Sequence, residues 1–134
     1  MMKIVLDCNV IIGAGLKPGG TCYRVIREVL LNHRCIVSKE ILEEYRITIN
    51  KPRLRKHREP IEMIADRLEK VAEEVTGAVN PFKLADPDDE IYLAAAFSAK
   101  ADILITGDLA HFPEPFYGTV RILRPHEFLS LYGK

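Results

Sequence analysis

Short apolar runs alternate with helix-length segments along this chain, and this alternation limits the possible folds more than any other feature of the sequence. Four runs have the length and apolar content of buried strands, within residues 3–6, 34–37, 102–106 and 119–123. A strand–helix–strand order favours a mostly parallel sheet with helices on both faces. The predicted fold class is therefore α/β, a three-layer α/β/α sandwich around a mostly parallel sheet.

Capping residues and helical spacing place the helices between these strands. Thr21, Ser38 and Asp86 are residue types that cap helix N-termini, and Pro87 suits a first helical position. The predicted helices cover residues 21–31, 38–49, 60–75 and 86–101, with a short C-terminal helix after Pro125. Tyr45 and Phe97 are predicted to lie in the core.

Length and composition are those of an ordinary globular protein. The 134 residues, 48% hydrophobic and 28% charged, fit a single domain over 1–134. The early charge at Lys3 does not fit a signal peptide, and no apolar run approaches the roughly 20 residues of a membrane helix. We therefore expect a cytoplasmic protein without a membrane partner. The three widely spaced cysteines are expected to be buried free thiols.

Acidic residues gather where the predicted topology brings strand ends together. Asp7 directly follows the first strand, and Asp108 follows the third strand after one glycine. Asp89 lies in the first turn of helix 86–101, and Glu44 lies early in helix 38–49. Right-handed crossovers place the carboxyl ends of parallel strands at one edge, where open α/β sheets have their sites. The four acids are therefore predicted to share that edge.

Helical geometry separates Glu44 from its neighbour Glu43. The apolar residues of helix 38–49 define an inward face. At about 100° per residue, Glu44 falls beside that face and Glu43 falls nearly opposite it. Glu44 is therefore the candidate site residue, and Glu43 is expected to be solvated.

Each acid also has a purely structural interpretation as a turn, cap or first-turn residue. Clustering like charges is unfavourable unless a cation is bound. An oxygen-only set of ligands suits Mg²⁺ or Mn²⁺, and such a site can hydrolyse a phosphodiester bond. Asp7, Glu44, Asp89 and Asp108 are accordingly predicted to be both catalytic and metal-binding residues.

Residues outside the acid cluster are candidates for substrate contacts. Asn9 is placed to hold Asp7 or a water of the site. The basic stretch 51–58, with Arg53, Arg55 and Lys56, could contact the phosphates of a polyanionic substrate, although a charge run is more often a solvated loop. Net charge is zero, with 19 basic and 19 acidic residues, which argues against bulk attraction to nucleic acid. The four histidines lack zinc-ligand spacing, and no P-loop motif is present.

Four motifs in order along the chain resemble the PIN-domain family, in particular its VapC-like toxins. They are IVLDCNV around Asp7, SKEILEEY with Glu44, DPDDE with Asp89, and ADILITGD with Thr106 and Asp108. The resemblance covers nearly the whole chain. It implies a divalent-metal-dependent endoribonuclease with an α/β/α fold, and it places Thr106 as a polar neighbour of the last acid. It also implies frequent homodimers and an antitoxin protein as partner. Ala110 stands where some relatives carry an additional acid.

Two other classes of function compete with this hypothesis. A PIN-fold module that binds nucleic acid or a partner without cleavage is the alternative, and the four intact acids argue against it. An aspartyl-phosphate enzyme is the third possibility, because Asp7 also ends the first strand. A haloacid-dehalogenase-type phosphatase would need a second Asp where Asn9 stands, and a receiver would need a late Lys and a central phosphoacceptor Asp.

Overall fold

The structure, a computed structural model, describes residues 1–133. The strands are β1 (Lys3–Leu6), β2 (Arg34–Val37), β3 (Glu73–Glu74), β4 (Ile103–Ile105), β5 (Phe116–Tyr117) and β6 (Val120–Leu123). The helices are α1 (Cys8–Leu16), α2 (Thr21–Asn32), α3 (Lys39–Ile49), α4 (Arg58–Val71), α5 (Pro87–Ser98) and α6 (Pro125–Tyr132), and a 3₁₀ helix, η1, covers Pro52–His57.

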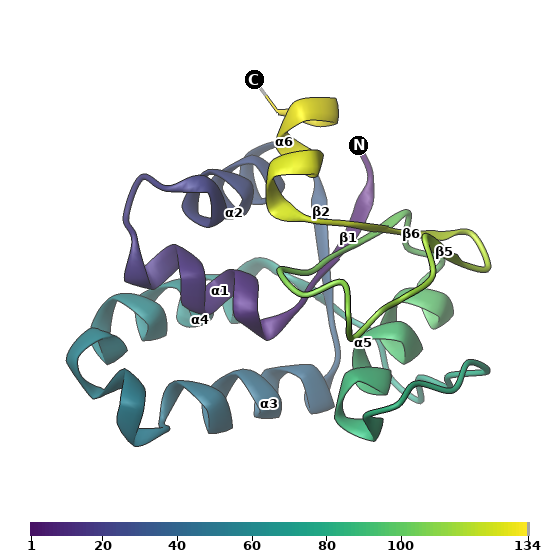
Figure 1. Ribbon diagram of the computed structural model, residues 1–134, viewed down its shortest axis with the longest axis horizontal. Coiled ribbons are helices and arrows are strands. Elements are labelled where there is room, and N and C mark those ends of the chain that lie inside the picture. Colours follow the sequence, from purple (N-terminus) through teal and green to yellow (C-terminus); the bar gives the residue numbers. More distant parts are fainter. Residues whose placement is uncertain (134) are drawn as a thin grey trace.

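The strands form one six-stranded sheet in the order β3-β2-β1-β4-β6-β5. Every neighbouring pair is parallel except β5 with β6. The central strands β1 and β4 are apolar and almost fully buried, because helices cover both of their faces. Figure 1 shows β1 and β2 in the centre, with α1 to α4 to their left and below. The predicted fold class, a mostly parallel α/β/α arrangement, is confirmed.

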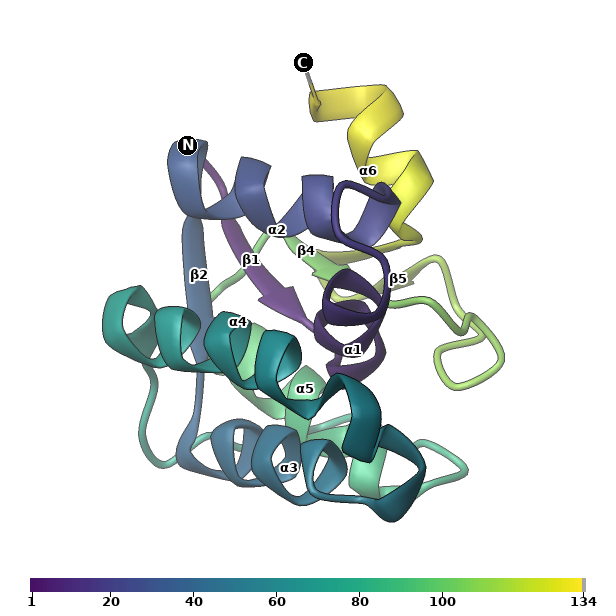
Figure 2. The same cartoon turned by 90° about the vertical axis from the view of Figure 1, so that its left-hand side faces the viewer.

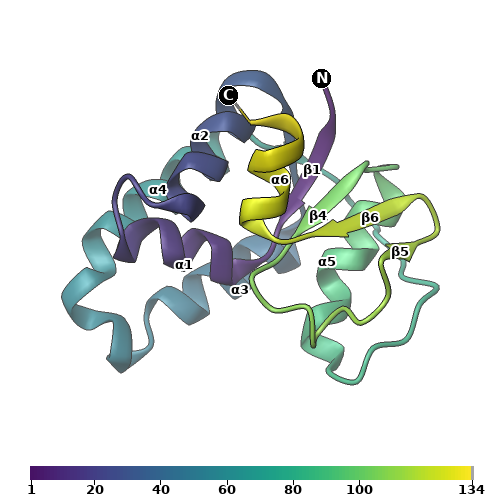
Figure 3. The ribbon, with the colours of Figure 1, turned by 45° about the horizontal axis from the view of Figure 1, so that its top comes forward.

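The helices lie in layers on either side of the sheet. Figure 2 shows α2 and α4 in front of β1 and β2. Figure 3 shows α6 in front of the sheet and α5 behind it. Strand β1 lies between β2 and β4, so Asp7 at its end enters the middle of the sheet's carboxyl edge. Helices α3 and α5 begin at the same edge, after Ser38 and Asp86.

The helix predicted over 60–75 is wrong at both ends. Helix α4 begins at Arg58 and ends at Val71, and Ala72 turns to an extended conformation. The chain then pairs with β2 as the short strand β3, and the N–H of Val75 donates to the carbonyl of Val37 over 2.8 Å. Val75 continues the helical apolar spacing by coincidence, because it packs against the core from a strand-like segment.

Two further expectations need correction, and one more strand was not predicted. Phe97, expected in the core, has 44% of its surface exposed, and its ring contacts Phe82 edge-on. The three cysteines are free thiols as predicted, but Cys22 is only half-buried. Strand β5 escapes prediction, because two residues carry no periodic signal. Within residues 1–133, no helix is long and apolar enough to span a membrane.

Candidate active site

Asp7 occupies the turn between β1 and α1 and is only 5% exposed. Its Oδ2 accepts a 2.8 Å hydrogen bond from the hydroxyl of Thr106 and a 3.3 Å bond from Nδ2 of Asn9. Oδ1 of Asn9 in turn accepts from the N–H of Gly107 at 2.9 Å. Asn9, predicted to hold Asp7, and Thr106, predicted only as a polar neighbour of Asp108, therefore both orient Asp7 and connect it to the loop that follows β4.

Burial governs the protonation of Asp7. Loss of solvent raises the pKa of its carboxyl, and the hydrogen bond from Thr106 acts in the opposite direction. A buried carboxylate whose pKa is raised is under-compensated, since its donors do not offset the lost hydration. A nearby cation would therefore stabilise the charged form of the Asp7 carboxylate.

Asp89 lies one turn into α5 and is 8% exposed. The helix is fixed at that point by Asp86, whose Oδ1 accepts from the N–H of Asp88 at 2.9 Å. Oδ2 of Asp89 is buried and has no hydrogen-bond donor. The Nδ1 of His111 approaches it to 3.3 Å, without hydrogen-bond geometry.

The pKa of Asp89 is raised to about 6. Burial is the main cause; proximity to His111 lowers this pKa, whereas the negative charge of Asp7 raises it. Asp7 and Asp89 line the same hollow, at the edge predicted from the sequence. They come from distant parts of the sequence and from different elements, a strand end and a helix start.

Glu44 lies on α3 and lines the same hollow as Asp7 and Asp89. Its side chain is half-buried, whereas that of Glu43 is exposed. Ser38 fixes the start of α3, because its hydroxyl accepts from the N–H of Ile41. One oxygen of Glu44 accepts a 3.3 Å hydrogen bond from the hydroxyl of Thr48. The predicted choice of Glu44 over Glu43 agrees with this exposure.

Asp108 lies apart from the other three acids. About half of its side chain is exposed, and its Oδ1 accepts from the N–H of Ala110. Nε2 of His111 lies 3.3 Å from its Oδ2, while Nδ1 of the same ring lies 3.3 Å from Asp89. His111 therefore links Asp108 to Asp89, a role that spacing between histidines could not reveal. Its position three residues after Asp108 was the available signal.

Asp7, Glu44 and Asp89 line a cavity of about 280 Å³ at the carboxyl edge of the sheet, whereas Asp108 does not. Its walls include Asp7, Asn9, Glu44, Thr48, Lys51, Arg53, Asp86, Asp88, Asp89, Tyr92 and His111. Of the predicted substrate-binding residues in the basic stretch, Arg53 lines the cavity, whereas Arg55 and Lys56 do not. Lys51, at the start of the stretch, lines it as well. The cavity thus has an acidic floor, the buried Asp7 and Asp89, and a rim on which exposed basic and acidic side chains both lie.

The donor set fits a divalent cation. The buried Oδ2 of Asp89 lacks a partner, and burial raises the pKa of both Asp7 and Asp89. Carboxylate oxygens are the donors that Mg²⁺ and Mn²⁺ prefer. In the part of the chain that the structure describes, however, no three His, Cys, Asp or Glu side chains come close enough to hold an ion directly. The described residues therefore offer carboxylate oxygens to a cation but no set of three direct ligands.

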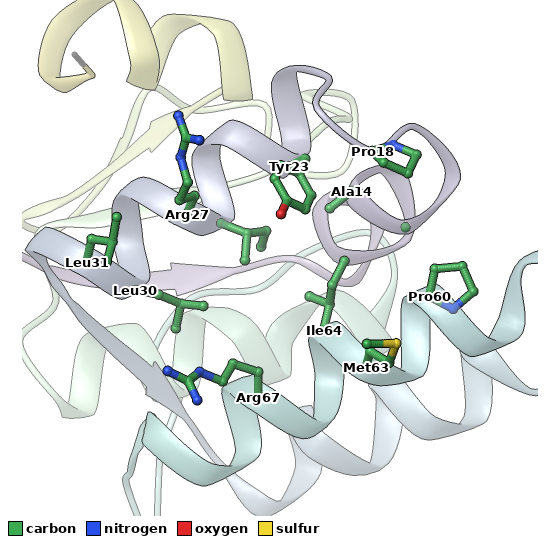
Figure 4. Close-up of a pocket in the computed structure, with 12 residues that line it drawn as sticks. Ala14, Pro18, Tyr23, Arg27, Leu30, Leu31, Pro60, Met63, Ile64 and Arg67 are labelled. Carbon is green, nitrogen blue, oxygen red and sulfur yellow. The ribbon is translucent and has the colours of Figure 1, made fainter.

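A second hollow, of about 410 Å³, lies between α2 and α4. Figure 4 shows Leu30 of α2 and Ile64 of α4 on facing sides of this groove. Its exposed apolar side chains include Leu31 at 73% and Met63 at 65%. None of the described residues that line it is a carboxylate, so this larger hollow lacks the chemistry of the acidic cavity and is a surface of a different kind.

The fold and the acidic cavity define an α/β protein with a carboxylate site at the carboxyl edge of its sheet. A family model described as "PIN domain" matches residues 3–110, and the chain belongs to the PIN-domain family. Among solved structures, it is similar to VapBC2 from Rickettsia felis bound to a DNA fragment from their promoter, with a TM-score of 0.63 and 15% identity over 92% of this chain and 98% of that chain. None of the curated proteins matches it.

Proposed function

We propose that this chain is a divalent-metal-dependent endoribonuclease that hydrolyses RNA phosphodiester bonds. The single observation that carries the proposal is the pair Asp7 and Asp89, two buried carboxylates on one cavity, each with a raised pKa. Such a pair is unfavourable in the isolated chain and becomes favourable when a divalent cation neutralises it. Membership of the PIN-domain family supports the same reaction class.

In this proposal each acid has a stated part. Asp7, Glu44 and Asp89 hold Mg²⁺ or Mn²⁺, directly or through water, and Asp108, outside the cavity, contributes through His111, which contacts both Asp108 and Asp89. Asn9 and Thr106 keep Asp7 in place through their hydrogen bonds. When bound, the cation polarises the phosphoryl oxygen and favours ionisation of water.

Two basic side chains at the cavity support a polyanionic substrate. Lys51 and Arg53 lie on the wall of the cavity that contains the acids. Side chains of this charge bind phosphates next to the bond that is cut. A single strand of RNA laid across the rim would place one phosphate over the acids.

A cleavage assay tests this proposal. We expect the wild-type chain to cut a mixed pool of single-stranded RNA with Mn²⁺ present and to stop when EDTA removes the metal. Asp89→Asn, which keeps the size of the side chain, should not cut. Binding of RNA without cleavage in Mn²⁺ would favour the alternative, a non-catalytic module. The spacing of the acids, which assembles no three-ligand cluster among residues 1–133, is the observation in favour of that alternative.

A protein partner forms a second part of the proposal. The similar VapBC2 structure was determined bound to promoter DNA, and its two-part name supports an antitoxin partner here. The groove between α2 and α4 has exposed apolar side chains that a partner segment would cover, and Arg27 and Arg67 in its lining favour an acidic segment. Leu31→Glu with Met63→Glu should abolish co-purification with a co-expressed product of the neighbouring gene. Unchanged co-purification would exclude this groove.

Self-association is proposed from the resemblance alone. Light scattering on the purified chain tests it, because a homodimer scatters as twice the chain's mass. A mass equal to one chain across the working concentrations would contradict the homodimer.

A further inference from the structure

Two tyrosines are buried at the carboxyl edge of the sheet, and they differ in one respect. Tyr45 on α3 is 1% exposed, and its hydroxyl donates a 2.6 Å hydrogen bond to the carbonyl of Leu6. Tyr92 on α5 is 2% exposed, and its hydroxyl has no hydrogen-bond partner among residues 1–133. The hydroxyl of Tyr45 stabilises the fold through its hydrogen bond, whereas the hydroxyl of Tyr92 makes no such bond.

Tyr92 lies one helical turn after Asp89 and lines the same acidic cavity. Burial raises the pKa of Tyr92, and the nearby charges of Asp7 and Glu44 raise it further. The N–H of Cys8 is also near, but it does not meet the hydroxyl with hydrogen-bond geometry. The hydroxyl therefore lies within the electric field of the carboxylates that form the cavity.

Within residues 1–133, two buried side-chain nitrogen or oxygen atoms make no hydrogen bond, and both belong to residues that line this cavity: Oδ2 of Asp89, which has only the 3.3 Å contact with Nδ1 of His111, and the hydroxyl of Tyr92. A buried hydroxyl without a partner destabilises a fold, and a phenylalanine ring would fill the same space without that defect. The two unpaired groups are one acceptor and one group that can both donate and accept. A ligand that enters the cavity can satisfy them together.

The chemistry of the cavity selects that ligand. Its acidic floor favours a cation over an anion, and its oxygen donors favour a hard divalent ion. The carboxylates of the described residues do not gather as three direct ligands. The cavity of about 280 Å³ has room for several waters, each of which occupies roughly 30 Å³ in the liquid. Mg²⁺ ordinarily keeps several waters when it binds to a protein.

We infer that the hydroxyl of Tyr92 is a positioning group that hydrogen-bonds a water of a hydrated divalent cation held between Asp7, Glu44 and Asp89. The inference rests on the proposed function, and it adds a neutral residue to a site otherwise defined by acids. Groups that orient the ligands of a metal from outside its direct contacts change metal affinity by roughly 10–100-fold when removed. The hydroxyl of Tyr92 contributes to cation binding, and its ring contributes to the packing of the core.

Tyr92→Phe tests this role, because it removes one oxygen and keeps the ring. We expect it to weaken Mn²⁺ binding by about tenfold in calorimetry. In EDTA its thermal midpoint should equal or exceed that of the wild type, because an unpaired hydroxyl is lost. Tyr45→Phe is the matched control, and it should lower the midpoint, because the bond to Leu6 is lost.

The outcomes separate this inference from the proposed function. Wild-type Mn²⁺ affinity in Tyr92→Phe would overturn the inference alone, and the cation site would stand. A lower midpoint for Tyr92→Phe in EDTA, or a failure to fold, would also overturn it, because the hydroxyl would then serve the fold. Absence of Mn²⁺ binding in the wild type would overturn both proposals.

Discussion

The hydroxyl of Thr106 donates a 2.8 Å hydrogen bond to Oδ2 of Asp7, across 99 positions of sequence. The two residues end neighbouring parallel strands, since Leu6 on β1 is in register with Ile105 on β4. This bond therefore links the position of the first acid to the sheet itself. It also opposes the effect of burial on the pKa of Asp7.

Removal of that hydroxyl should destabilise the fold. Thr106 is fully buried, so Thr106→Val leaves Asp7 with one donor fewer and also leaves the N–H of Asp108 without its 3.1 Å acceptor. Because the acceptor is a carboxylate, we expect a loss of about 1.5–3 kcal/mol in urea unfolding at pH 7. Thr48→Val is the control, and its longer 3.3 Å bond to the half-buried Glu44 predicts a smaller loss. Equal losses of stability in the two variants would show that the hydrogen bond from Thr106 to Asp7 contributes no more than the bond from Thr48 to Glu44.

Stability of the metal-free chain should depend on pH through Asp89. Its pKa is about 6 in the fold, against roughly 3.9 for an unfolded aspartate. Between these values the folded chain binds more protons than the unfolded chain, so this group makes stability rise as pH falls from 7 towards 4. Above about pH 6 its destabilising effect is complete.

Unfolding of wild type and Asp89→Asn in EDTA between pH 4 and 7.5 measures this contribution as a difference. The amide of the variant does not titrate in this range, so we expect the variant to gain stability relative to the wild type as pH rises. A difference that does not vary with pH would contradict the raised pKa of Asp89.

Adjacent glutamates on α3 should behave differently in cleavage. Glu44 lines the acidic cavity, and Glu43 is exposed. Glu44→Gln is expected to lower the rate of RNA cleavage by at least about tenfold, because a ligand or orienting carboxylate is lost. Glu43→Gln should keep the wild-type rate. Equal rates for the two variants would remove Glu44 from the proposed site.

The basic stretch offers a similar comparison. Arg53 lines the cavity, and Arg55, two residues later on the same 3₁₀ helix, does not. Arg53→Ala should weaken RNA binding and reduce the slope of log K against log salt by about one. Arg55→Ala should leave both closer to wild type. The reverse order would place the RNA on the other side of η1.

Much of this arrangement follows from patterns that the sequence displays. The runs before Asp7 and Asp108 are apolar, and strands of this kind must be buried in a parallel sheet. Glu44 could be separated from Glu43, because a helix has a fixed angular step. Membership of the PIN-domain family agrees with the resemblance that these motifs carried.

Other features depend on packing that no local pattern records. Helix α1 is apolar on all sides because it is almost wholly buried, so it carries no amphipathic signal. Its Gly15 lies directly against Ile61 of α4, where a side chain would not fit. The two-residue strand Glu73–Glu74 is exposed and acidic, and only its pairing with β2 identifies it.

The site shows the same division. That Asp7, Glu44 and Asp89 lie on one hollow could be predicted from their places in the strands and helices, whereas Asp108, predicted with them, does not line it. His111 is placed between Asp89 and Asp108 by the loop after β4, which has no periodicity. The unpaired hydroxyl of Tyr92 is a property of its surroundings in three dimensions, because the same residue type at position 45 is fully paired.

Calorimetric titration with Mn²⁺, wild type against Asp7→Asn, tests the central claim most directly, because it requires no knowledge of the RNA target. The buried Asp7 has a raised pKa, so its amide variant should remain folded, which circular dichroism can check. We predict that the wild type binds Mn²⁺ and that Asp7→Asn binds it more than about 100-fold more weakly. This loss would exceed that expected when a residue that only orients a metal ligand is removed. A wild type that does not bind Mn²⁺, or a folded variant that binds it equally well, would contradict the carboxylate metal site.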